Sequence, residues 1–364
     1  MLTCLYKKHI ISIRKVNKEI ILLYIAEIET PNIFMDISSN LYFGGSLMQD
    51  EAQTLRRIAD NIELAIIGKR RQIELVVMCM ASGGHVLIED VPGVGKTSLV
   101  QALAKSVNCG FKRIQFTSDT LPSDITGYSA YNPKIDSFEF HQGAVFSNFI
   151  LADEINRTTS KTQASLLEIM EEGQVTVDAK TYKMQQPFMV LATQNSAEFV
   201  GTYPLPEAEI DRFLVRVSLG YPGRDDEVKV IESNLMGKAK TLRPVAEPED
   251  IMEIKQAVSK IYVDEAIERY IVSIAQATRS NPDVMLGVSP RGSVALAKMC
   301  QAYALYFGKE FVIPDYVKVL APYVLAHRLV LSHEAQINKK DPDDIISDAL
   351  KTVPVPGPIR YLNT

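Results

Sequence analysis

The sequence has 364 residues, of which 46% are hydrophobic and 23% are charged, and its formal net charge is −5. This composition is that of a globular protein, and the length suggests two domains because single hydrophobic cores seldom grow beyond about 250–300 residues. The small negative charge excludes a bulk electrostatic attraction to nucleic acid, although it leaves room for a local basic pore.

Residues 1–47 differ from the rest of the chain. They mix lysine and arginine with an isoleucine-rich run and then pass through turn-forming residues. The apolar run at 20–26 is far shorter than the roughly 20 residues that span a bilayer, and no small-residue cleavage pattern follows it. We therefore expect a cytoplasmic protein with no membrane span and no secretory signal. The segment is either an extension ahead of a functional start at Met48 or a small appended element, and both alternatives stay open.

From residue 48 to residue 220, short apolar runs alternate with helical patterns. Such alternation predicts a parallel β-sheet covered by helices on both faces. The expected strands are residues 85–89, 112–116, 148–152, 188–192 and 213–217. Two inserts, at 126–140 and 173–184, interrupt this order and have the turn residues and alternation of β-hairpins.

From residue 221 onward the chain is expected to be almost wholly helical up to about residue 350. The proline-rich stretch at 353–358 cannot continue a helix and ends the fold. The sequence thus predicts an α/β core at 48–220 with a parallel sheet flanked by helices, followed at 221–364 by an all-helical domain and its tail.

The first candidate site is a glycine-rich loop between the first expected strand and a helical pattern. Strand, loop and helix N-terminus together are typical of loops that cradle phosphate with backbone N–H groups. Lys96 is expected to reach the β- and γ-phosphates of ATP and the Thr97 hydroxyl to bind Mg²⁺. The general motif has glycine where this chain has Asp90. The residues expected to bind the nucleotide are Pro92, Gly93, Val94, Gly95, Lys96, Thr97 and Ser98.

Two carboxylates follow the third expected strand. Asp153 and Glu154 stand at the end of an apolar run, where buried carboxylates are costly without a cation or a positive partner. In an ATPase the first such residue supports Mg²⁺ and the second activates the attacking water. The alternative is that Asp153 and Glu154 simply cap the following helix, which could hold for Asp153 and still leave Glu154 unexplained. The two motifs in this order predict Mg²⁺-dependent ATP hydrolysis.

Further polar residues stand at strand ends and at a helix start. Asn195 follows the fourth expected strand, Arg212 precedes the fifth, and Arg291 lies in the first turn of a later helix. Because ligands bind at the carboxyl ends of parallel strands, Asn195 is expected to face the γ-phosphate. Arginine binds phosphate bidentately, although for either arginine alone a surface salt bridge is the commoner interpretation.

Taken together, these motifs resemble the AAA+ ATPases, and within them the MoxR family. The matching passages run in the family's order over nearly all of residues 48–357, and they are EDVPGVGKTSL, FTSDTLPSDITG, FILADEINR, LLEIMEEGQVTV, LATQN, LPEAEIDRF and SPRG. LADEINR with LPSDITG is the specific part of the match. The family often carries aspartate at the position of Asp90, so that departure leaves the expectation of nucleotide binding intact.

The resemblance implies a role for each candidate residue. Glu154 would be the catalytic base, and Asn195 would be the sensor that reads the γ-phosphate. Arg291 would be the second sensor, reaching from the helical lid onto the nucleotide of its own subunit. Arg212 would be the arginine finger given in trans to a neighbouring subunit, with Arg216 as the alternative.

The resemblance also implies a ring-shaped ATPase, usually a homo-hexamer, that remodels or matures partner proteins. The two hairpins would lie around its central pore. The partner often carries a von Willebrand factor type A domain, and the outcome is often metal-cofactor insertion or complex assembly. The alternative is a nucleic-acid-stimulated motor or a metal-chelatase-type motor subunit, since related AAA+ clades share both hairpins. The acidic balance of the chain favours the protein-remodelling function.

Overall fold

The computed structural model describes residues 2–6, 9–16, 19–23, 47–194, 202–235 and 242–357. The chain divides into two compact units, one of residues 1–44 with 356–364 and one of residues 45–355. In the first unit, an antiparallel sheet is formed by β1 (Leu2–Tyr6), β2 (His9–Val16) and β3 (Glu19–Leu23), with β2 in the middle. Whether residues 1–47 are needed for function stays a prediction.

The second unit is built on a five-stranded sheet in the order β12-β4-β11-β8-β5, and every neighbouring pair is parallel. The five expected strands are confirmed, each within two residues of its predicted start and end. They are β4 (Val86–Glu89), β5 (Phe111–Gln115), β8 (Phe149–Asp153), β11 (Met189–Gln194) and β12 (Val215–Val217). Because β11 lies between β4 and β8, the ends of these three strands meet at one edge of the sheet.

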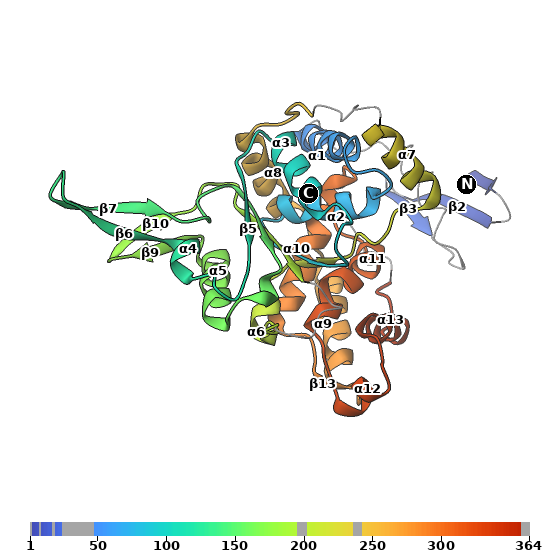
Figure 1. The fold of residues 1–364 in the computed structure, drawn as a ribbon. Coiled ribbons are helices and arrows are strands. Elements are labelled where there is room, and N and C mark those ends of the chain that lie inside the picture. The colour runs from blue at the N-terminus through green and yellow to red at the C-terminus, as the bar shows by residue number, and fades with distance from the viewer. Residues whose placement is uncertain are drawn as a thin grey trace. The chain divides into compact units, whose positions relative to one another are not determined.

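Helices cover both faces of this sheet, as predicted (Figure 1). Ile150 and Ala152 of β8 join a buried cluster with Leu166 and Leu167 of α5, while α3 packs against β5 and β8 from the other face. The helical segments of the α/β region are α1 (Leu47–Glu63), α2 (Arg70–Ala81), α3 (Lys96–Ser106), α4 (Pro122–Thr126), η1 (Ile155–Arg157), α5 (Ser160–Glu172) and α6 (Glu207–Ile210). Alternate residues of the apolar strands thus point to opposite cores, which is the expected pattern for a doubly covered sheet.

Both predicted hairpins are present, and they project together from one side of the sheet (Figure 1). The first pairs β6 (Gly127–Asn132) with β7 (Ser137–Gln142), and the second pairs β9 (Gln174–Val177) with β10 (Lys180–Lys183). The rings of Phe140 and Tyr182 stack with centroids 4.2 Å apart. One aromatic contact therefore joins the two hairpins.

The chain after β12 is helical, apart from a short antiparallel pair that the sequence did not predict. The helices are α7 (Arg224–Leu235), α8 (Pro248–Lys260), α9 (Glu265–Arg279), α10 (Pro290–Tyr306), α11 (Pro314–Leu325), η2 (Ala326–Arg328), α12 (His333–Ile337) and α13 (Pro342–Thr352). The pair consists of β13 (Val284–Leu286) and β14 (Val330–Leu331). Within the ranges that the structure describes, no helix is both long and apolar enough to cross a bilayer.

Candidate ATPase site

The glycine-rich loop connects β4 to α3 and is accessible to solvent. Gly93 and Gly95 have φ values of +86° and +92°, which lie in the left-handed region that disfavours residues with a side chain. Gly95 is the N-cap of α3, and Lys96 is the first residue of that helix. The exposed N–H groups at this helix start and the helix dipole suit an anion such as phosphate.

Asp90 explains the departure from the general motif. The residue is buried, and its carboxylate accepts hydrogen bonds from the N–H groups of Leu219 and Gly220, the latter at 2.8 Å. The Ser218 hydroxyl donates to the same oxygen at 3.4 Å. The Asp90 carbonyl in turn accepts from Nζ of Lys96 at 2.9 Å. Asp90 thus fastens the phosphate loop to the chain that leaves β12 and leads to the helical domain.

The two predicted carboxylates lie at the carboxyl end of β8 and share one threonine. The hydroxyl of Thr193 donates to Oδ1 of Asp153 at 2.6 Å and accepts from the N–H of Glu154 at 2.8 Å. Glu154 has a φ of +57°, which costs about 1–3 kcal/mol for a residue other than glycine. Because the Glu154 side chain makes no capping bond to the following η1, the helix-cap alternative receives no support. Sequence reasoning missed Thr193, although a polar residue at the end of an apolar strand was a usable signal.

Two residues of the neighbouring strand β5 contact these carboxylates. Arg113 forms an ion pair with Asp153, with NH2 and Oδ2 2.5 Å apart, and Nε2 of Gln115 donates to Oε2 of Glu154 at 2.7 Å. Arg157 lies 3.3 Å from the same Glu154 oxygen. Each carboxylate therefore has a positive or hydrogen-bonding partner, which the charged form requires at this partly buried edge.

The residues present fit a Mg²⁺ ion that also binds phosphate. Mg²⁺ prefers oxygen ligands and commonly takes only one or two from protein, with water and phosphate supplying the rest. Thr97, in the first turn of α3 after β4, offers a hydroxyl, and Asp153, at the end of β8, offers a carboxylate; β11 lies between β4 and β8. Among the described residues, no group of three or more His, Cys, Asp or Glu could hold a metal ion without such help.

Asn195 lies outside the described residues, and its predicted role is not tested. Its neighbour Gln194 ends β11, and the Gln194 carbonyl accepts from the N–H of Asp90 at 3.3 Å. The strand that leads to Asn195 therefore does end beside the phosphate loop, as expected.

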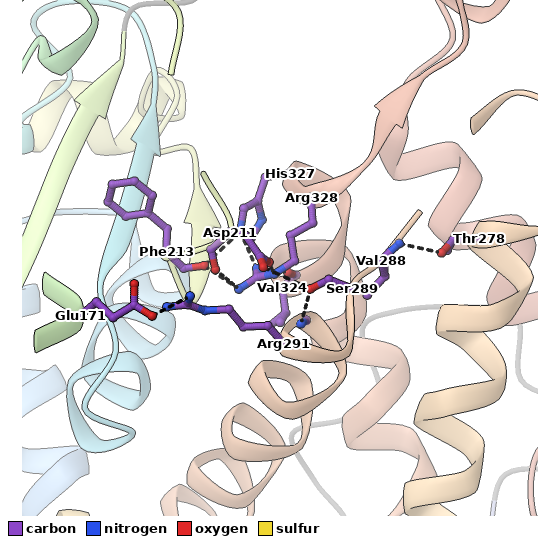
Figure 2. A network of polar contacts seen from close by, with 11 residues as sticks. Glu171, Asp211, Phe213, Thr278, Val288, Ser289, Arg291, Val324, His327 and Arg328 are labelled. Atoms are coloured by element: carbon purple, nitrogen blue, oxygen red, sulfur yellow. Dashed lines mark hydrogen bonds and ion pairs between the residues drawn. The ribbon is translucent and has the colours of Figure 1, made fainter. Parts of the chain in front are cut away.

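Arg212 and Arg291 come from distant parts of the chain and pair with the same glutamate. Nε of Arg212 lies 3.3 Å from Oε2 of Glu171. NH1 of Arg291 lies 3.1 Å from Oε1 of the same residue (Figure 2). Glu171 stands near the end of α5. Both arginines thus lie within ion-pair distance of a carboxylate of their own chain, and their proposed roles toward nucleotide stay predictions.

Arg216 has a different environment. Its guanidinium lies 3.4 Å from Oε2 of Glu89 and 2.8 Å from Oδ2 of Asp343, so it links β12 both to β4 and to α13. A pocket beside it is lined by residues of β4, β12, α11 and α13. Arg216 therefore joins the sheet to helices of its own chain.

His85 is a buried residue whose hydrogen bonds stabilise the fold, and it is not part of the candidate site. Its Nε2 donates to the Met170 carbonyl at 3.0 Å, and its Nδ1 accepts from the N–H of Val190 at 3.0 Å. Burial lowers the pKa of His85 to about 4. The ring is therefore neutral at physiological pH, which agrees with one nitrogen donating and the other accepting.

Known proteins resemble the chain along most of its length. A model of the ATPase family associated with various cellular activities (AAA) matches residues 85–215, and a model of the AAA lid domain matches residues 276–349. The Bacillus subtilis protein YeaC is 48% identical over 311 residues, covering 85% of this chain and 97% of its own. The Mycobacterium tuberculosis protein named chaperone MoxR1 is 37% identical over 323 residues, covering 86% of this chain and 85% of its own. The crystal structure of a candidate ATPase from Cytophaga hutchinsonii has a TM-score of 0.79 and 35% identity, covering 85% and 97% of the two chains.

Proposed function

The chain belongs to the MoxR family of AAA+ ATPases. We propose that it hydrolyses ATP with Mg²⁺ and that it works as a ring of identical subunits. The energy of hydrolysis would be used to remodel or mature partner proteins. The observation that carries the proposal is the meeting of three features at one sheet edge: the phosphate loop after β4, the two carboxylates after β8, and β11 between them. Ligands of open α/β sheets bind at such an edge.

Each residue of this edge has a chemical task in the proposed reaction. Lys96 would exchange the Asp90 carbonyl for phosphate oxygens, and Glu154 would accept the proton of the attacking water. Gln115 and Thr193 hold the side chain and the backbone of Glu154, respectively, and so orient the base. Mg²⁺, held through Thr97 and Asp153, would supply charge neutralisation for the transferred phosphoryl group.

Arg212 is the better candidate for a finger given to a neighbouring subunit. Arg216 contacts two carboxylates, Asp343 at 2.8 Å and Glu89 at 3.4 Å, and so links β12 to β4 and α13. The ion pair of Arg212 with Glu171, by contrast, is 3.3 Å long and ends on a glutamate whose side chain is 43% exposed. A finger given in trans requires assembly, and the proposed assembly is a homo-hexamer. Arg291 is proposed to read the nucleotide of its own subunit.

The first hairpin offers a surface for a protein client. Tyr131, Ile135 and Phe138 are 52%, 59% and 73% exposed, and the rings of Tyr131 and Phe138 touch with centroids 5.7 Å apart. Exposed apolar side chains on a projecting element suit contact with protein better than contact with a polyanion. We propose that the protein is cytoplasmic and acts on a protein client or on a partner with a von Willebrand factor type A domain, with metal-cofactor insertion or complex assembly as the outcome.

The test of hydrolysis measures phosphate release with MgATP for the wild type and three variants. The Glu154→Gln variant keeps the shape of the side chain but cannot accept a proton, so it should bind ATP and lose turnover by orders of magnitude. Glu168→Gln, an exposed change on α5, serves as the matched control and should match the wild type. Lys96→Ala should weaken ATP binding itself. A Glu154→Gln variant within two-fold of wild-type turnover would refute the assignment.

A second measurement distinguishes a protein-remodelling ATPase from a nucleic-acid motor. Hydrolysis is followed with and without single-stranded DNA over a range of salt concentrations. The remodelling function predicts no stimulation, whereas a nucleic-acid motor predicts stimulation that falls steeply as salt rises.

A mixing experiment tests whether Arg212 acts across a subunit boundary. Glu154→Gln lacks the base but still offers Arg212, and Arg212→Ala lacks the finger but keeps its base. In mixed rings some sites have an intact base facing an intact finger, so the mixture should regain activity that neither variant has alone. A mixture that forms mixed rings but stays inactive would exclude Arg212 as the trans-acting residue.

A further inference from the structure

Arg328 is a charged residue buried in the helical domain. It ends η2, and its side chain is only 3% exposed. Burial lowers the pKa of its guanidinium to about 10, so the group still carries its charge at neutral pH. A buried charge is stable only when its donors are matched by acceptors. The acceptors of Arg328 therefore show which groups it holds in place.

Those acceptors flank Arg212. NH2 of Arg328 donates to the carbonyl of Asp211 at 3.1 Å and to the carbonyl of Phe213 at 2.8 Å (Figure 2). Its Nε lies 2.8 Å from Oδ1 of the Asp211 carboxylate. One guanidinium from the helical domain thus hydrogen-bonds the backbone immediately before and immediately after Arg212.

The other side of Arg328 is anchored to its own domain. NH1 donates to the carbonyl of Val324 at 2.7 Å and lies 2.7 Å from Nε2 of His327. Burial, with a smaller contribution from Arg328, lowers the pKa of His327 well below its ordinary value. Nε2 of His327 also lies 3.2 Å from the Phe213 carbonyl, so Arg328 and His327 contact the same backbone oxygen. Arg328 therefore has little freedom to move relative to α11.

The helix that carries Arg291 rests on the same cluster. The hydroxyl of Ser289, the N-cap of α10, donates to Oδ2 of Asp211 at 3.1 Å and accepts from the N–H of Gly292 at 3.2 Å. A Cβ at Gly292 would lie 3.0 Å from Cδ of Arg328 and 2.7 Å from Cγ1 of Val288. The glycine thus allows the first turn of α10 to approach the Arg328 side chain.

We propose that Arg328 is a positioning residue for Arg212: the helical domain of one subunit uses it to fix the arginine that this subunit presents to the nucleotide of the next. The inference rests on the proposed function, in which Arg212 acts in trans. A planar guanidinium can bind two carbonyls and a carboxylate at once, which an ammonium group on a flexible stem cannot reproduce. Displacing a reacting group by about 1 Å can cost roughly 100-fold in rate.

The alternative is that Arg328 only holds the helical domain against the sheet. The two roles differ in what a mixing experiment shows. A positioning defect affects the finger side of a site and leaves the base side intact. A variant at Arg328 should therefore behave like Arg212→Ala, although it lies more than a hundred residues away in sequence.

The test uses Arg328→Lys and, as a milder second variant, Asp211→Asn. Arg70→Lys is the matched control, because Arg70 also links the two regions, bonding Glu74 of α2 and the Tyr306 hydroxyl of α10, but contacts no residue next to Arg212. Both test variants should bind ATP with the wild-type KM and lose roughly 10- to 100-fold in kcat. Mixed with Glu154→Gln, each should regain activity. Arg70→Lys should lower the melting temperature without a change in kcat.

Hydrogen exchange gives a readout that does not need hydrolysis. Arg328→Lys should speed exchange in the peptide that contains residues 207–215, and Arg70→Lys should not. A wild-type protein without ATPase activity would refute the proposed function. The exchange experiment would still test whether Arg328 holds the backbone on either side of Arg212 in place. Wild-type kcat in folded Arg328→Lys, or activity lost in both variants and not regained on mixing, would overturn the positioning role. If Arg328→Lys fails to fold, Asp211→Asn decides by the same criteria.

Discussion

Thr193 offers the most direct test of how the candidate site is built. Its side chain is 1% exposed, and one hydroxyl serves both Asp153 and Glu154. Thr193→Val keeps the shape and removes the hydroxyl. The Glu154 N–H then loses its acceptor, and the Asp153 carboxylate loses one donor.

The expected cost follows from these two lost bonds. Leaving a buried N–H unpaired costs about 1–3 kcal/mol, and a hydrogen bond to a charged group contributes about 1.5–3 kcal/mol. Asp153 keeps its ion pair with Arg113 and is partly accessible to water, which reduces the second term. We therefore expect Thr193→Val to lower the free energy of unfolding by about 2–4 kcal/mol. Because the backbone of Glu154 is held at a positive φ by this bond, ATP turnover should fall by at least ten-fold.

Thr193→Ser is the matched control, because it keeps the hydroxyl and removes only a methyl group. Urea unfolding and phosphate release are measured for both variants. The serine variant should lie near the wild type in turnover, and the valine variant should not. Equal turnover in the two variants would show that the hydroxyl does not orient the carboxylates.

Three further predictions concern other parts of the chain. A protein that starts at Met48 should bind ATP and assemble like the full chain, as judged by a binding titration and by size; loss of either shows that residues 1–47 are needed. Asp90→Gly restores the general motif but leaves the N–H groups of Leu219 and Gly220 without their acceptor. ATP should therefore bind more weakly, and the hydrogens of both amides should exchange faster. Unchanged ATP binding would show that Asp90 has no effect on the loop. The pKa of His85 falls from about 6.5 in the unfolded chain to about 4 in the folded one, so its contribution to stability is complete above pH 6.5 and is lost as pH falls toward 4. Between pH 7 and 5 the free energy of unfolding should fall by about 2 kcal/mol for this reason. A His85→Gln variant with the same dependence of stability on pH would contradict this.

The fold could be predicted because its signals are local. Each strand of the main sheet is a short apolar run bounded by polar or turn-forming residues, and each hairpin has alternation around a turn. The position of β11 between β4 and β8 brings the polar ends of the three strands to one edge, as the expected place of Asn195 requires. The short pair of β13 and β14 was missed because strands of three and two residues carry no periodicity.

In the candidate site, too, the residues with a local sequence signal could be predicted and the others could not. Lys96, Thr97, Asp153 and Glu154 were identified because each stands in a motif whose members are adjacent in sequence. Their partners were not, because the partner of a polar side chain is chosen by the folded structure. Gln115 lies 39 residues from Glu154, and Arg328 lies 117 residues from Asp211. Neither pairing has any local pattern.

The shared glutamate shows what such distant pairings can add to a motif. Arg212 and Arg291 bring two positive charges to Glu171, which supplies one negative charge. Glu209 also interacts electrostatically with Arg212, so the two arginines face two carboxylates. Both arginines and Glu171 are partly exposed, so each ion pair is worth at most about 1 kcal/mol. A phosphate group can therefore displace Glu171 at little cost, whereas the Asp211–Arg328 contact behind it is buried and holds the backbone of Arg212 in place. The arrangement joins a loosely held side chain to a firmly held backbone, which is what a finger that must enter a neighbouring site requires.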